Sequence, residues 1–154
     1  MAEDSATSAV CVSSAGGVFL DALAVSEMWE GPVRWIAVRA PDTEARLVDS
    51  DVRWRSEVGL RQPIGLLHSY RDANRELKAW RPSWVISAGT GIAAGWFLAA
   101  YHLGIPSLWI ETLNIYGDQG LAATLCSRLA DRVIVQRPQQ LTAHRRAMLL
   151  GELY

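Results

Sequence analysis

The sequence lacks most features that identify extracellular, nucleic-acid-binding or common nucleotide-binding proteins. Only two of its 154 residues are cysteines, Cys11 and Cys126. Both lie in predicted elements, which favours small core residues in a reducing compartment over a disulfide or a metal pair. The net charge of −1 is not the basic excess of a general nucleic-acid binder. No G-x-G-x-x-G, Walker or G-x-S-x-G motif is present, so NAD, ATP and a serine nucleophile are not indicated.

Charge is also missing from one long stretch. Pro82 to Ile110 contains no Asp, Glu, Lys or Arg, and this run exceeds the roughly 20 residues that a bilayer requires. It nevertheless holds four glycines and two prolines, which divide it into short elements. It therefore predicts a buried strand at Trp84–Ser87, a helix at Ile92–Leu103 and a second strand at Ser107–Ile110, rather than a membrane span.

The rest of the chain repeats this alternation of strands and helices. The alternation predicts one doubly wound α/β domain with a mainly parallel sheet, covering residues 9–154 after a disordered stretch at 1–8. Strands are expected at Ala9–Val12, Val33–Ala40, Val52–Val58 and Arg132–Val135, and helices at Phe19–Met28, Pro63–Trp80, Leu121–Ala130 and Gln139–Arg145.

The predicted helix at Pro63–Trp80 has an apolar face, and its first turns are unusual. Apolar side chains there lie close in sequence to several arginines. These apolar residues are either part of the core, with solvated arginines beside them, or a surface that rests on an anionic membrane. The predicted apolar face comprises Ile64, Leu67, Tyr70, Leu77 and Trp80. The apolar residues that cluster beside the arginines Arg53, Arg55 and Arg61 are Leu60, Ile64, Leu66 and Leu67.

Polar or glycine-rich loops follow four of the predicted strands. In a parallel sheet all of these loops lie at the same edge, where such folds bind their ligands. A glycine-rich turn into a helix also exposes N–H groups to an anion such as phosphate, although a tight turn without a ligand would have the same sequence. The candidate substrate-binding residues are Ser13, Ser14, Gly16, Gly17, Gly89, Thr90, Gly91 and Asn114. Gln136 follows the last of these four strands, Arg132–Val135.

Glu111 is the candidate catalytic residue because it ends a buried apolar strand. It could act as a general base, bind substrate hydroxyls, accept a loop N–H or serve only as a hydrogen-bonded structural residue. The histidines His68, His102 and His144 are scattered and are expected to be structural, so neither a metal site nor a cofactor is predicted. Asp42 or Thr43 is expected to cap a short helix.

Several short motifs in order resemble one family. Ser13–Gly17 resembles the Ser-Ser-Gly-Gly-His-Leu signature of a glycosyltransferase-subunit family, and Arg39 with Pro41–Glu44 resembles its R-x-P-D-T-E segment. Ser87–Gly91 resembles its S-x-G-x-G loop. Three further matches complete the series, namely Ile110-Glu111, Ala130-Asp131 with Val135-Gln136, and Gly151. The family is the recruiting subunit of the two-part N-acetylglucosaminyltransferase of dolichol-linked oligosaccharide assembly, with bacterial counterparts in exopolysaccharide synthesis.

The resemblance implies the N-terminal half of a GT-B glycosyltransferase. That half supplies the acceptor side of the cleft and the membrane contact, and a partner chain binds the UDP-sugar. The acceptor would be a lipid-linked or polysaccharide precursor, and the two glycine loops would hold a phosphate or pyrophosphate. Val18 replaces the family's histidine. No membrane anchor precedes the first strand, which favours a peripheral, bacterial-type subunit.

Two other classes of function are compatible with the sequence. One is a stand-alone nucleotide- or small-ligand-binding module, and the other is a scaffold that recruits a transferase without taking part in catalysis. The expected location is the cytoplasm, with peripheral contact at the inner face of the plasma membrane. No nucleic-acid partner is expected.

Overall fold

A single seven-stranded sheet forms the centre of the protein. The computed structural model describes residues 7–113, 120–144, 146–151 and 153. Every strand pair within these residues is parallel, and the strand order is β3-β2-β1-β4-β5-β6-β7. The predicted doubly wound α/β fold with a parallel sheet is therefore confirmed.

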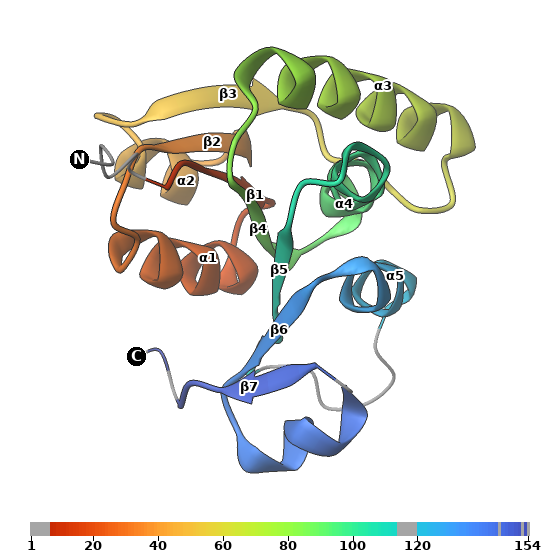
Figure 1. Cartoon of the computed structure of the whole chain (residues 1–154). Coiled ribbons are helices and arrows are strands. Elements are labelled where there is room, and N and C mark those ends of the chain that lie inside the picture. The colour runs from red at the N-terminus through yellow and green to blue at the C-terminus, as the bar shows by residue number, and fades with distance from the viewer. Residues whose placement is uncertain (1–6, 114–119, 145, 152, 154) are drawn as a thin grey trace, which may run out of the picture.

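The elements alternate along the chain (Figure 1). The strands are β1 (Ala9–Ser13), β2 (Val33–Val38), β3 (Asp51–Arg55), β4 (Trp84–Gly89), β5 (Ser107–Ile110), β6 (Arg132–Val135) and β7 (Ala147–Leu149). The helices are α1 (Gly17–Glu27), α2 (Pro41–Arg46), α3 (Pro63–Trp80), α4 (Gly91–Leu103), α5 (Leu121–Leu129) and the 3-10 helix η1 (Pro138–Ala143).

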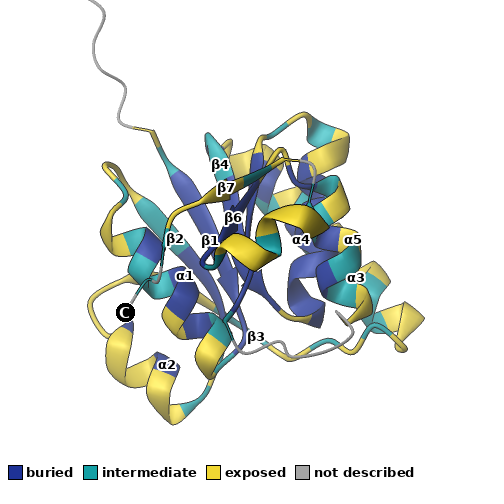
Figure 2. Cartoon of the chain, turned by 90° about the horizontal axis from the view of Figure 1, so that it is seen from below, coloured by how far each residue is buried: buried dark blue, intermediate teal, exposed yellow. Residues whose placement is uncertain are grey.

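The sheet carries a separate hydrophobic core on each face, because successive strand residues point to opposite sides. Val10, Val12 and Val85 belong to the core beneath α3, α4 and α5. Cys11 and Ile86 belong to the core on the opposite face, which α1 covers. Figure 2 shows the central strands buried and the outer helix faces exposed. Burial on both sides explains why these strands read as continuous apolar runs.

The close crossing of α3 and α4 decides which face of α3 is buried. A Cβ atom on Gly95 would lie 2.7 Å from Ser69 Oγ and 2.8 Å from Tyr70 N, so only glycine permits this approach. The buried residues of α3 are accordingly Ser69, Ala73 and Leu77. At the start of the helix the predicted apolar face is not part of the core, because Ile64 is 73% exposed and Leu67 is 46% exposed.

Other expectations differ from the structure in detail. The third strand ends at Arg55 rather than Val58, and the last predicted helix is the 3-10 helix η1. The expected disorder at 1–8 falls mostly outside the described residues, and so does the candidate Asn114. None of the helices within the described residues combines the length and hydropathy needed to span a bilayer.

Candidate functional site

The predicted loops meet at one edge of the sheet. Because all strands are parallel, the segments after β1, β4, β5 and β6 leave the same rim, and these four strands are neighbours. The strand order reverses direction between β1 and β4, which makes this the topological switch point where doubly wound folds bind ligands. We refer to the segments Ser13–Gly17 and Gly89–Gly91, which follow these two strands, as the glycine loops.

The two glycine loops are bonded to each other. Ser14 Oγ lies 2.5 Å from Thr90 Oγ1, and the Ser14 N–H donates to the Gly89 carbonyl at 3.4 Å. Ser13 and Ser14 are buried, whereas Gly16, Gly17 and Thr90 are exposed. Gly16 has a φ of +85°, which favours glycine, and a Cβ there would meet nothing within 4 Å. The loops therefore present a single surface whose outer part faces open space.

Carboxylates occupy some of the donors in these loops. The Gly16 N–H donates to Asp42 Oδ2 at 2.9 Å, and the Thr90 hydroxyl donates to Glu57 Oε1 at 2.9 Å. The expected N-cap of α2 was wrong, because Ala40 rather than Asp42 or Thr43 holds that position; Thr43 instead accepts the Ala40 N–H with its side chain at 3.0 Å. An anion that binds the first loop must therefore displace or accommodate Asp42.

Glu111 is buried at the rim and is held by two donors. Its Oε2 atom lies 3.2 Å from Trp109 Nε1 and 3.1 Å from His144 Nε2. Both side chains of the Glu111–His144 pair are buried. This pair brings a carboxylate and an imidazole together, and such a pair can hold or pass a proton. His144 was expected to be a structural residue with no link to the site. It instead contacts the candidate catalytic residue directly.

Gln136 connects Glu111 to the opposite side of the rim. Its Nε2 donates to the Glu111 carbonyl at 3.2 Å and to Asp21 Oδ1 at 3.1 Å. Asp21, on α1, is 1% exposed. The structure thus places Gln136 in the network that fixes the backbone of Glu111. Sequence reasoning had placed Gln136 at the rim but had given no role to Asp21, which lies inside an apolar helix.

A cavity of about 550 Å³ opens beside His144. Arg128 of α5 and Arg146 line it together with the hydroxyl side chains of Thr124 and Ser127. Arg128 and Arg146 therefore contribute two cations beside His144 of the Glu111–His144 pair. Among the described residues, no three His, Cys, Asp or Glu side chains gather closely enough to hold a metal ion.

Comparison with solved structures identifies the architecture. MurG from Acinetobacter baumannii superimposes with a TM-score of 0.77 at 23% identity, covering 93% of this chain and 45% of that one. This chain has the fold of one half of a GT-B enzyme. No protein-family model and no curated protein matches the sequence.

Two further solved structures are also matched over less than half of their length. A UDP-GlcNAc 2-epimerase from Methanocaldococcus jannaschii gives a TM-score of 0.73 at 10% identity, covering 95% of this chain and 46% of that one. A glycosyltransferase from Rickettsia africae gives a TM-score of 0.70 at 13% identity, covering 95% of this chain and 43% of that one. The chain thus spans less than half the length of each of these three neighbours.

Proposed function

We propose that this chain is the acceptor-side half of a two-chain glycosyltransferase. A partner chain binds the UDP-sugar, and the sugar is transferred to a lipid-linked or polysaccharide precursor. The main support is that 93% of the chain matches only 45% of MurG. A GT-B cleft lies between two halves, so one half by itself forms only one wall. Exposed apolar side chains on the outermost described strand, including Met148 and Leu149 of β7, offer surface for a partner.

In this proposal the rim residues divide the work of binding and catalysis. Glu111, oriented by Trp109 and His144, takes the proton from the acceptor hydroxyl as the bond from its oxygen to the anomeric carbon of the sugar forms and the bond from that carbon to the UDP oxygen breaks, so that UDP leaves. The glycine loops hold the substrate's phosphate or pyrophosphate through their exposed residues Gly16, Gly17 and Thr90, whereas Gly89 and Gly91 are buried beneath that surface. Arg128 and Arg146, which line the cavity beside His144, neutralise further negative charge. Asn114, in the segment after Glu111, is proposed to bind substrate as well.

The exposed start of α3 supports contact with a membrane. Ile64 and Leu67 are exposed there, and Arg61 and Arg71 are exposed on the same segment. Apolar side chains flanked by arginines suit the boundary of a bilayer that contains anionic lipid. An acceptor anchored in the membrane would then be presented to the rim by the same molecule.

Substitution of Glu111 in the reconstituted pair tests this assignment. The chain would be co-expressed with the subunit encoded by the neighbouring reading frame and assayed for transfer from UDP-N-acetylglucosamine to lipid extract. Glu111→Gln should lower turnover by roughly 100-fold to 10,000-fold, the usual contribution of a general base. Glu27→Gln, on the exposed end of α1, is the matched control and should leave turnover unchanged. Equal turnover of the Glu111→Gln pair and the wild-type pair would remove Glu111 from the chemistry and favour a scaffold.

A stand-alone ligand-binding module is the second candidate. It is favoured by a cavity of about 680 Å³ that a single chain forms by itself. Calorimetric titration of the isolated chain with UDP-N-acetylglucosamine separates the two proposals. The two-chain proposal expects no low-micromolar binding of the UDP-sugar without the partner, whereas low-micromolar binding by the chain alone would support the module.

A further inference from the structure

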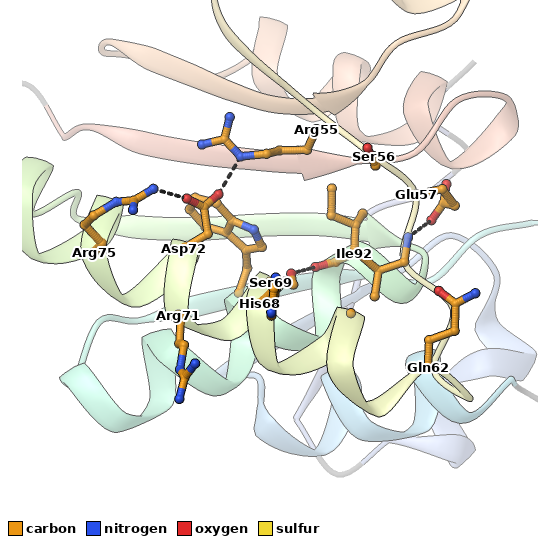
Figure 3. Close-up of a pocket in the computed structure, with 13 residues that line it drawn as sticks. Arg55, Ser56, Glu57, Gln62, His68, Ser69, Arg71, Asp72, Arg75 and Ile92 are labelled. Carbon is orange, nitrogen blue, oxygen red and sulfur yellow. Dashed lines mark hydrogen bonds and ion pairs between the residues drawn. The ribbon is translucent and has the colours of Figure 1, made fainter.

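The cavity of about 680 Å³ lies outside the rim network described above. It is enclosed by the segment after β3, by the first half of α3 and by the start of α4 (Figure 3). Its volume falls in the range of about 300–1,000 Å³ that is typical of small-molecule sites. It adjoins the rim, because Glu57 lines the cavity and also accepts the Thr90 hydroxyl. A ligand in the cavity would therefore lie next to the glycine loops.

The indole N–H of Trp96 is an unused donor in the wall of this cavity. Trp96 is only 1% exposed, yet its N–H has no acceptor among the described residues. Every fully enclosed polar side-chain atom in the described part of the chain has a hydrogen-bond partner. The Trp96 N–H is therefore not fully enclosed by protein atoms, and the open space that Trp96 lines is this cavity. An indole can only donate, so the missing partner is an acceptor oxygen on a ligand or a water.

The charges around the cavity do not favour an anion. Arg55 donates to Asp72 at 2.5 Å and contacts Glu76 at 3.5 Å, and Arg75 is paired with the same Asp72. Arg71 points away from the other side chains (Figure 3). The guanidinium groups that face the cavity are therefore already neutralised, and Glu57 adds negative charge. Apart from Arg71, whose side chain points away, the lining offers a phosphate no guanidinium group that lacks a carboxylate partner.

The remaining polar groups of the cavity wall can form hydrogen bonds with the hydroxyl groups of a ligand. The Gln62 amide, the Ser56 and Ser69 hydroxyls and the Glu57 carboxylate line the cavity. Together with the Trp96 indole they offer both donors and acceptors, and a sugar hydroxyl requires both. Ile92 and the rest of the Trp96 side chain add an apolar part to the wall. We propose that this cavity binds a neutral sugar ring, with one ring oxygen or hydroxyl accepting the Trp96 N–H. Its assignment as a unit of the acceptor rests on the function proposed above, whereas sugar binding itself does not.

Indole N–H signals give a direct test. The full chain, labelled with nitrogen-15, would be titrated with methyl N-acetyl-β-D-glucosaminide, with methyl β-D-glucoside and with inorganic phosphate. Trp96→Phe identifies the Trp96 signal among the seven tryptophans. We expect a saturable shift of this signal with at least one glycoside and none with phosphate. A shift with phosphate alone, or with none of the three probes, overturns the proposal.

A blocking variant separates cavity binding from indirect effects. A Cβ on Gly65 would make ordinary contacts at 3.6 Å with Gln62 and Val58, both of which line the cavity. Gly65→Leu should therefore fill space in the cavity and weaken glycoside binding by roughly tenfold or more. Ala79→Leu, exposed at the far end of α3, is the matched control and should bind as the wild type does. Unchanged binding by Gly65→Leu overturns the proposal.

The sugar site and the proposed function fail in different ways. Glycoside binding in a chain that shows no transferase activity with its partner would reject the proposed function and leave the sugar site intact. Transfer activity without a Trp96 shift would reject the sugar site and leave the proposed function intact.

Discussion

At the scale of single residues, three carboxylates determine the character of the rim. Asp42 and Glu57 each accept a donor from a glycine loop, and Glu111 accepts from an indole and an imidazole. The position of Glu111 could be predicted because a charged residue ending a buried strand is unusual. Its partner His144 could not, because the two residues are 33 positions apart in the chain and no local pattern connects them.

The two cysteines lead to a prediction about alkaline pH. Burial raises the pKa of the Cys11 and Cys126 thiols from 9.0 to about 12. The unfolded chain therefore releases these protons from about pH 9 upward, while the native chain retains them until about pH 12. The free energy of unfolding should fall with rising pH across this window, by about 2.7 kcal/mol per pH unit for both thiols together.

Urea unfolding at pH 8, 9 and 10 measures this dependence. A Cys11→Ala/Cys126→Ala variant should be less stable at pH 8 because it loses buried side-chain volume, but its stability should change less above pH 9. Identical pH slopes for the variant and the wild type would contradict the prediction.

At the scale of elements, the contact between α3 and α4 illustrates both the success and the failure of sequence reasoning. The bounds of α3 were predicted correctly, because Pro63 begins the helix and the polar and apolar residues have a helical period. The sequence left open whether the large apolar residues at its start are buried or exposed. The close approach at Gly95 instead buries the small residues Ser69 and Ala73, and hydrophobicity alone does not reveal that preference.

Two glycine substitutions on these helices should have opposite effects. Gly95→Ala forces α3 away from α4, because the new Cβ would lie 2.7 Å from Ser69 Oγ, and it should cost about 1–3 kcal/mol of stability. Gly65→Ala makes only ordinary contacts at 3.6 Å and should gain up to about 1 kcal/mol from helix propensity. Chemical denaturation measures both values. A neutral Gly95→Ala variant would show that the crossing can relax without cost.

At the scale of the whole molecule, the features that we propose to serve a membrane-bound substrate lie near one another. The exposed start of α3 and the cavity of about 680 Å³ share one segment of the chain, since Gln62 and Gly65 line the cavity and Ile64 between them is exposed. The rim lies next to both through Glu57. This arrangement would place a lipid anchor, a sugar and the candidate base in sequence along one side of the protein.

Vesicle binding tests the membrane contact. Ile64→Glu/Leu67→Glu should reduce co-sedimentation with vesicles that contain phosphatidylglycerol by roughly tenfold or more, because two apolar side chains lose their burial in the bilayer. Val48→Glu removes an equally exposed apolar residue between α2 and β3 and should have no effect. Equal binding by all three proteins would argue against the membrane proposal.

The sequence by itself determined the parallel sheet and the order of strands and helices as far as β6, but it did not predict β7 as a strand. These features depend on hydrophobic periods and on glycine and proline positions, which act within short segments. Only the tertiary structure decided which side chains meet at the rim. Ser14 and Thr90 are 76 positions apart, and Gly16 and Asp42 are 26 apart. Such pairs form only when the strand order brings distant loops to the same edge, and the strand order depends on packing across the whole molecule.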